Sequence, residues 1–164
     1  MTDAPEISAT ASARANTVPW PPILLVAALA LAIAAGSLWP LPWPGQDDGP
    51  ARFVGLGFGV LGVVLTAWAV ATLIRHNTTV MPDRRSDTLV TSGPYRFVRN
   101  PIYLGETFLL LGLAEITKNI WFAAAAAGFA VSVTALQILS EERHLEARFG
   151  DAYRSYKAAT RRWI

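Results

Sequence analysis

Two long stretches without a charged residue restrict the fold of this chain more than any other feature. Residues 53–74 form a run of 22 uncharged, mostly apolar residues, and residues 120–139 form a run of 20. An α-helix needs roughly 20 such residues to cross the hydrocarbon core of a bilayer. Because a bilayer offers no water to unpaired backbone groups, only helices and closed barrels can span it. We therefore predict an all-α integral membrane protein.

Two shorter apolar stretches bring the predicted number of transmembrane helices to about four. Residues 23–39 form the first, and residues 101–116 form the third, which carries only Glu106 and Glu115 as charged residues. The short segment 117–119, with the sequence TKN, joins the third and fourth helices into a helical hairpin. The expected architecture is a bundle of antiparallel membrane helices.

The remaining composition excludes several classes of function. The chain has no cysteine, so disulfides and cysteine-based metal sites or nucleophiles are excluded. His76 and His144 are far apart and no carboxylate spacing completes a site around them, so we expect no metal. No glycine-rich phosphate loop or basic-aromatic patch indicates a nucleic-acid partner. Residues 1–19 are small and polar, which predicts a disordered tail before a single membrane domain, residues 20–164.

The basic residues predict the orientation in the membrane. Most of them lie between the second and third helices or after the fourth: Arg75, Arg84, Arg85, Arg96, Arg99, Arg143, Arg148, Arg154, Lys157, Arg161 and Arg162. The opposite loops carry only Arg52 and Lys118. Cytoplasmic loops are enriched in Lys and Arg, so both termini and the segments 75–100 and 140–164 are predicted to be cytoplasmic. We expect a multi-pass protein of a bacterial inner membrane.

Chemistry-bearing residues gather where the third helix is expected to begin. Asn100 occupies an N-cap position, and Pro101 suits the first helical turn. The free backbone N–H groups of such a helix end could bind a carboxylate or phosphate. The alternative is that the arginines only anchor the helix and Asn-Pro only starts it. Glu106 lies about one turn further in, where a carboxylate usually faces a partner or a watery cavity, unless it reaches the interface instead.

The segment after the fourth helix carries a second set of candidates. Apolar and aromatic residues recur there at helical spacing, interrupted by a glycine: Leu145, Phe149, Tyr153, Tyr156 and Thr160. This pattern predicts an amphipathic helix with a basic face towards water, of a kind that can lie on an anionic membrane surface. Glu141 and Glu142 leave the membrane at the same level as Asn100 and Tyr103. The two sets could therefore line one pocket.

Both segments resemble a known superfamily. The sequence LVTSGPYRFVRNPIYLG, followed after a helical hairpin by EERHLEARFGDAYRSYKAATRRW, is similar to the isoprenylcysteine carboxyl methyltransferases and phospholipid methyltransferases. The resemblance covers roughly residues 70–163. It implies an all-α membrane bundle with a cofactor pocket capped by the two cytoplasmic segments. It also implies S-adenosylmethionine as the cofactor and a membrane lipid or lipid-linked molecule as the methyl acceptor.

The same resemblance implies a set of site residues. Glu141 and Arg99 are the catalytic candidates. The cofactor-binding candidates are Asp87, Thr88, Leu89, Val90, Tyr95, Asn100, Pro101, Ile102, Tyr103 and Glu142.

Two departures leave the methyl acceptor open. The isoprenylcysteine enzymes have His at the position of Asn100, and they have Arg where this chain has Gln137. The missing Arg favours the amine of a phospholipid over a prenylcysteine carboxylate. Two other interpretations remain: a nicotinamide-dependent enzyme on a related scaffold, as in some sterol reductases, and a non-enzymatic membrane protein whose basic C-terminal helix binds anionic lipid.

Overall fold

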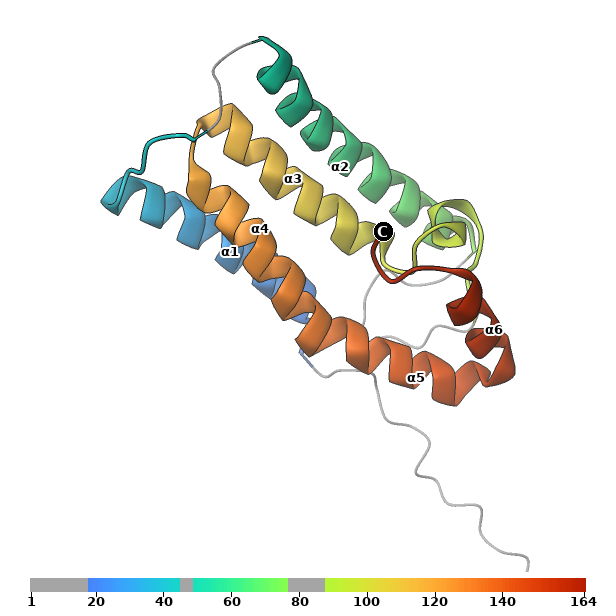
Figure 1. Ribbon diagram of the computed structural model, residues 1–164. Coiled ribbons are helices and arrows are strands. Elements are labelled where there is room, and N and C mark those ends of the chain that lie inside the picture. The colour runs from blue at the N-terminus through green and yellow to red at the C-terminus, as the bar shows by residue number, and fades with distance from the viewer. Residues whose placement is uncertain (1–17, 45–48, 77–87) are drawn as a thin grey trace, which may run out of the picture.

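Every regular element in the described part of the chain is helical. The computed structural model describes residues 18–44, 49–76 and 88–164. The elements are α1 (Trp20–Leu38), α2 (Gly49–Arg75), the 3-10 helix η1 (Gly93–Arg96), α3 (Pro101–Thr117), α4 (Ile120–Val133), the π-helix η2 (Thr134–Ile138), α5 (Leu139–Phe149) and α6 (Asp151–Ala159). Figure 1 shows α4, η2 and α5 as one continuous rod. The prediction of an all-α fold is confirmed.

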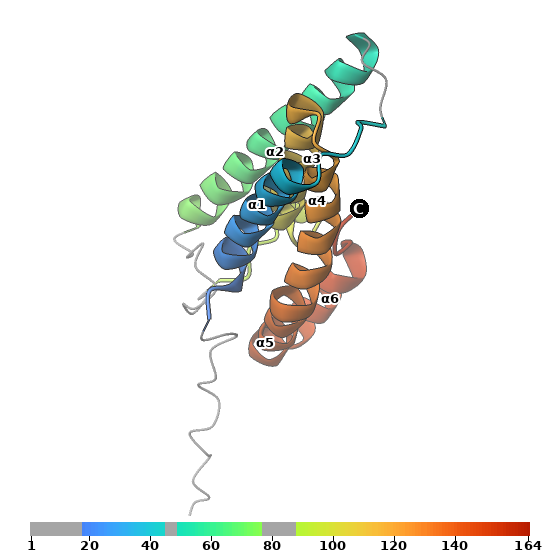
Figure 2. The ribbon, with the colours of Figure 1, turned by 90° about the vertical axis from the view of Figure 1, so that its left-hand side faces the viewer.

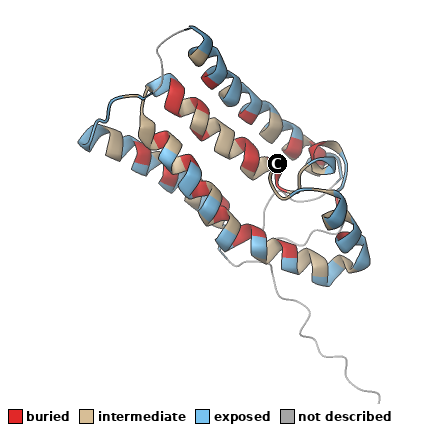
Figure 3. Ribbon diagram, viewed as in Figure 1, coloured by how far each residue is buried: buried red, intermediate tan, exposed pale blue. Residues whose placement is uncertain are grey.

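In the described part of the chain, three helices are long and apolar enough to cross a membrane. They are α1, α2 and the continuous helix Ile120–Phe149. Large apolar side chains on α1 and α2 point outward, for example Leu31 and Phe53, which are 69% and 77% exposed. Figure 3 shows the same pattern as pale outer faces on these helices. A surface this apolar is typical of contact with lipid and confirms the predicted membrane protein.

The expected third membrane stretch forms α3, which differs from the other three. It has 17 residues, carries Glu106 and Glu115, and is not one of the three long apolar helices. Pro101 begins it, and Lys118 ends it in the left-handed conformation with a φ of 53°. It packs on both α2 and α4, and α4 packs on α1. Figures 1 and 2 show the resulting order α1, α4, α3, α2, with α3 inside the bundle.

Glycines allow α2 and α3 to approach closely. A Cβ atom added to Gly112 on α3 would lie 2.5 Å from the Cα atom of Gly59 on α2. A Cβ atom added to Gly62 on α2 would lie 2.6 Å from the carbonyl oxygen of Gly105 on α3. Small residues at such contacts are the usual way for membrane helices to pack backbone against backbone.

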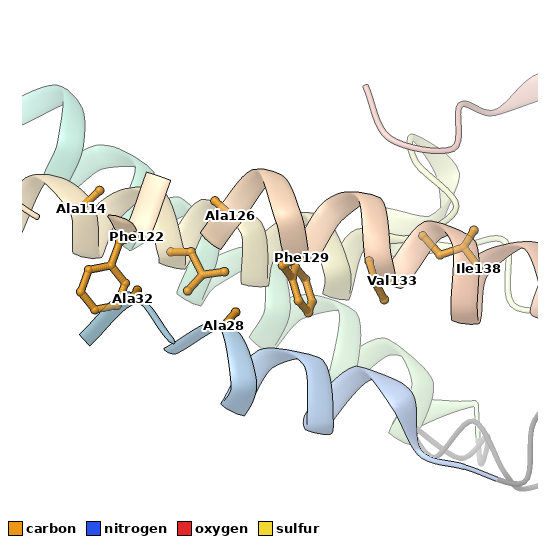
Figure 4. Close-up of a cluster of buried hydrophobic side chains, with 9 residues drawn as sticks. Ala28, Ala32, Ala114, Phe122, Ala126, Phe129, Val133 and Ile138 are labelled. Carbon is orange, nitrogen blue, oxygen red and sulfur yellow. The ribbon is translucent and has the colours of Figure 1, made fainter. Parts of the chain in front are cut away.

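A second interface joins α1, α3 and α4 through alanines and phenylalanines. Phe122 and Phe129 of α4 are both buried, and they belong to the same apolar cluster as Ala28, Ala32 and Ala114. Figure 4 shows both phenyl rings beside α1. The alanines leave the space that the rings fill, so the cluster fixes α4 against both of its neighbours.

The C-terminal segment returns to the bundle. α5 extends past the other helices, and α6 turns back towards them (Figure 1). Gly150 lies between the two helices and has a φ of 52°, a backbone conformation that suits glycine. The carbonyl of Arg161, which follows α6, accepts a hydrogen bond from the Arg99 amide at 2.8 Å. The Trp163 indole donates to the Thr134 hydroxyl at 3.3 Å. Residues 88–100 and the segment after α4 therefore meet at one end of the bundle.

Candidate active site

A cavity lies where these two segments meet. It encloses about 540 Å³, including the part open to the surroundings. It is lined by Leu73, Thr88, Leu89, Val90, Tyr95, Arg99, Asn100, Glu141, Glu142, Leu145, Tyr153 and Tyr156. These residues come from the end of α2, the segment before α3, and the helices α5 and α6.

Glu141 is held in place by two hydrogen bonds to one of its carboxylate oxygens. The Tyr103 hydroxyl donates to Oε1 at 3.1 Å, and the Gln137 amide Nε2 donates to the same atom at 2.7 Å. Gln137 is fully buried in the π-helix η2, one turn before Glu141. Single π-helical turns of this kind occur frequently at functional sites. The position where the isoprenylcysteine enzymes have Arg thus holds a neutral amide that orients the carboxylate.

Glu142 forms a buried ion cluster with two arginines. Its Oε1 lies 3.2 Å from Arg99 Nη2, and its Oε2 lies 2.8 Å from Arg162 Nη2. The side chains of Arg99 and Glu142 are only 10% and 7% exposed, whereas that of Arg162 is 36% exposed. The hydrogen-bonded Glu142 carboxylate raises the pKa of Arg162. The charge of Glu142 is thus balanced by groups of the protein itself.

Arg99 and Asn100 also hold the C-terminal segment. Arg99 Nη1 donates to the carbonyl of Lys157 at 3.0 Å and to that of Thr160. Asn100 occupies the predicted N-cap position of α3, but its side chain makes no cap bond and Nδ2 donates instead to the Arg162 carbonyl at 3.0 Å. The C-terminal segment passes directly beside residues 98–100, so the Asn100 side chain turns towards the Arg162 carbonyl and not towards the first turn of α3. Both residues therefore join two walls of the cavity.

Three tyrosines form an aromatic wall. The Tyr156 hydroxyl donates to the Tyr95 carbonyl at 2.7 Å. The ring centroids of Tyr153 and Tyr156 lie 6.1 Å apart with an interplanar angle of 61°, an edge-to-face contact. Burial raises the pKa of Tyr156 to about 12 and also raises the pKa values of Tyr95 and Tyr153. All three phenols are therefore neutral at physiological pH.

The structure brings most of the predicted site residues together. Eight of them line the cavity: Thr88, Leu89, Val90, Tyr95, Arg99, Asn100, Glu141 and Glu142. Tyr103 lies behind this lining and reaches Glu141, whereas Pro101 and Ile102 do not line it. Asp87 lies outside the described residues. In the part of the chain that the structure describes, no group of three His, Asp or Glu side chains could hold a metal ion.

Four lining residues were not among the predicted site residues. Leu145, Tyr153 and Tyr156 had a signal, because they belong to the apolar-aromatic pattern after the fourth membrane stretch. That pattern indicated a buried face without indicating what it covers. Leu73 had no signal, because it lies within the uncharged run 53–74 and no local pattern distinguishes it from its neighbours.

Comparisons with known proteins point to one family. The model of the family described as phospholipid methyltransferase matches residues 50–152. The chain is 39% identical over 67 residues to the cobalt-zinc-cadmium resistance protein CzcN of Cupriavidus metallidurans, a match that covers 40% of this chain and 31% of that protein. It is 47% identical over 36 residues to an uncharacterized protein of Haemophilus influenzae, covering 22% of this chain and 57% of the other. The chain thus spans less than two thirds of the length of either relative.

Proposed function

Because this chain belongs to the phospholipid methyltransferase family, we propose that it transfers a methyl group from S-adenosylmethionine to a lipid or lipid-linked acceptor at the cytoplasmic membrane face. The observation that carries the proposal is the cavity, which joins both family-like segments directly beside the membrane helices. A donor from the cytoplasm and an acceptor from the membrane could both reach such a position.

The cavity suits an adenosyl sulfonium compound. Leu89, Val90 and the aromatic wall offer apolar and aromatic surface to an adenosine. The Glu141 carboxylate offers negative charge to a cation. When bound, S-adenosylmethionine supplies an electrophilic methyl group on a positively charged sulfur. A nicotinamide dinucleotide would need cations for its pyrophosphate. Arg99 is the one cation among the described lining residues, and it is engaged by Glu142 and by backbone carbonyls.

The residues around the cavity divide into two roles. Glu141, oriented by Tyr103 and Gln137, would hold the acceptor at the methyl group. Arg99, a catalytic candidate from the sequence, is better assigned as a positioning residue, since its donors hold Glu142 and the C-terminal segment. Leu89, Val90 and the aromatic wall would exclude water from the cavity, and this exclusion keeps the electrostatic contacts strong.

An amine is the acceptor that this arrangement favours. A protonated amine is attracted by the Glu141 carboxylate, whereas a carboxylate acceptor would be repelled by it. The amide of Gln137 offers no positive charge to offset that repulsion. An ammonium group must lose a proton before its nitrogen lone pair can form the new N–C bond, and the Glu141 carboxylate can take that proton. We therefore propose a phospholipid amine as acceptor, in preference to a prenylcysteine carboxylate.

The first test measures cofactor binding and methyl transfer. We expect S-adenosylhomocysteine, and not NADPH, to raise the thermal unfolding midpoint of the full chain in detergent. With a methyl-tritiated donor and native lipid, the label should enter the lipid extract and resist base, as an N-methyl group does. Glu141→Gln should keep the stabilisation by S-adenosylhomocysteine and lose methyl transfer by about 100-fold or more.

Three results would count against the proposal. A base-labile label would identify a carboxyl ester and exclude the amine. Full transfer by Glu141→Gln would remove the assigned role of that residue. If no adenosyl ligand stabilises the chain, a non-enzymatic lipid-binding protein becomes the better interpretation.

A further inference from the structure

Glu106 on α3 carries a buried oxygen without a partner. Among the described residues, three side-chain polar atoms are buried without a hydrogen-bond partner: Trp43 Nε1, Thr66 Oγ1 and Glu106 Oε2. Of these three, only Glu106 can carry a negative charge. Burying such an atom unpaired is costly, because water no longer solvates it. A carboxyl group in this position either holds a proton or stays ionised beside a positively charged group that arrives from outside the chain, so it is suited to bind such a group.

The position of Glu106 relates it to the candidate active site. Tyr103 and Glu106 are three residues apart on α3 and therefore lie on the same side of the helix. The Tyr103 hydroxyl donates to Glu141, and the carboxylates of Glu106 and Glu141 both act electrostatically on that hydroxyl. Glu106 is the deeper of the two, because α3 leads from the cavity into the bundle. Tyr103 thus stands between a carboxylate in the cavity and another on the membrane side.

The second glutamate of α3 provides a contrast. Glu115, near the other end of the helix, is buried and forms an ion pair with Lys118. The same residue type in the same helix is thus neutralised by the protein at one end. At the cavity end, the one cation among the described lining residues is Arg99, whose donors go to Glu142 and to backbone carbonyls. The charge that would compensate Glu106 is therefore not supplied by these described groups.

We propose that Glu106 is a specificity-determining residue that binds the positively charged amine of the acceptor lipid at the membrane side of Tyr103. This inference rests on the proposed methyl transfer to an amine. A lipid that enters between the membrane helices would meet Glu106 first and Glu141 second. Together the two carboxylates would draw an ammonium group to the cavity and keep a carboxylate group away.

The experiment uses dodecylamine, a positively charged single-chain amine, as the probe and dodecanol as a neutral control of equal chain length. The full chain in detergent is compared with Glu106→Gln and with the matched control Glu115→Gln. We expect dodecylamine to raise the thermal midpoint of the wild type and of Glu115→Gln more than dodecanol does. Glu106→Gln should lose this difference.

Turnover and stability give two further readouts on the same variants. With phosphatidylethanolamine as acceptor, Glu106→Gln should raise the KM for lipid by about tenfold or more, the usual loss when a charged hydrogen bond is removed, and leave the KM for S-adenosylmethionine unchanged. Its thermal midpoint without ligand should be equal to that of the wild type or higher, since a neutral amide replaces an unpaired buried carboxyl group. Glu115→Gln should lower the midpoint, because the ion pair between Glu115 and Lys118 is lost.

The outcomes separate this inference from the proposed function. Equal dodecylamine and dodecanol effects in the wild type, an unchanged preference in Glu106→Gln, or a midpoint lowered as much as in Glu115→Gln would each overturn the role of Glu106. Failure of the proposed function would instead appear as no stabilisation of the wild type by S-adenosylhomocysteine.

Discussion

At the scale of single residues, the ion cluster of Glu142 explains how the cavity wall is held. Removing one partner of a buried ion pair leaves an uncompensated charge, which costs much more than the pair itself contributes. Arg99 is the buried partner and also binds two backbone carbonyls of the C-terminal segment. Arg162 is more exposed, and its guanidinium donates to both carboxylate oxygens of Glu142. The two arginines should therefore differ in their effect on stability.

We expect Arg99→Ala to lower the free energy of unfolding by about 3–5 kcal/mol, because it leaves Glu142 with a single partner and frees the C-terminal segment. Arg162→Ala should cost about 1 kcal/mol, because Arg162 is partly exposed and Glu142 keeps the buried Arg99 as its partner. Thermal unfolding of both variants in detergent measures the difference. Arg99→Lys should recover only part of the loss, because an ammonium cannot reproduce the forked guanidinium contacts. Equal losses for both alanine variants would mean that Arg99 is no more central than Arg162.

The sequence identified these residues better than it identified their contacts. The family-like motif placed Arg99, Asn100 and Glu142 in the site, and they do meet at the cavity. Their partners lie in the C-terminal segment, about 60 positions further along for Arg99, and no local pattern reveals a contact of that range. Gln137 is the exception, because it lies four residues before Glu141 on one continuous helix, a spacing at which two side chains can meet.

At the scale of elements, the contact between α2 and α3 places the start of α3 beside the cavity. Helix boundaries and apolar runs were readable from composition, since membrane helices require long uncharged segments. The pairing of α3 with α4 was readable as well, because a short turn joins them. The pairing of α2 with α3 was not, because one apolar face resembles another. The glycines decide it, and their effect depends on which of them face the partner helix. Gly62 faces the backbone of α3, whereas an added Cβ at Gly57 would meet nothing within 4 Å.

Gly62→Ala should separate α2 from α3 and lower the free energy of unfolding by about 1–3 kcal/mol, as overpacking of a close contact does. The added methyl group would meet the Gly105 carbonyl and the Leu109 amide, neither of which can move without shifting α3. Gly57→Ala, on the same helix, is the matched control and should leave stability unchanged or slightly improved. Thermal unfolding in detergent compares the two variants. If both behave alike, close glycine packing does not hold the two helices together.

At the scale of the whole molecule, the chemistry and the basic residues lie at the same end of the bundle. The cavity, α6 and the start of α3 occupy one end, and the start of α2 occupies the other (Figure 1). Arg99, Arg154 and Lys157 belong to the first end, whereas Arg52 and Lys118 belong to the second. The positive-inside rule then predicts that the cavity faces the cytoplasm, where S-adenosylmethionine is found.

The absence of cysteine makes this orientation directly testable. Gly49 and Ser155 are exposed and lie at opposite ends of the bundle, so a single cysteine can be introduced at either position without disturbing a core. In intact bacterial cells that produce the full chain, a membrane-impermeant maleimide should label Gly49→Cys, whereas Ser155→Cys should be labelled only after the membrane is opened. The cysteine-free parent chain reports background labelling. Labelling of Ser155→Cys in intact cells would place the cavity outside the cytoplasm, where a soluble adenosyl donor could not reach it, and would therefore exclude the proposed methyl transfer as well as the proposed orientation.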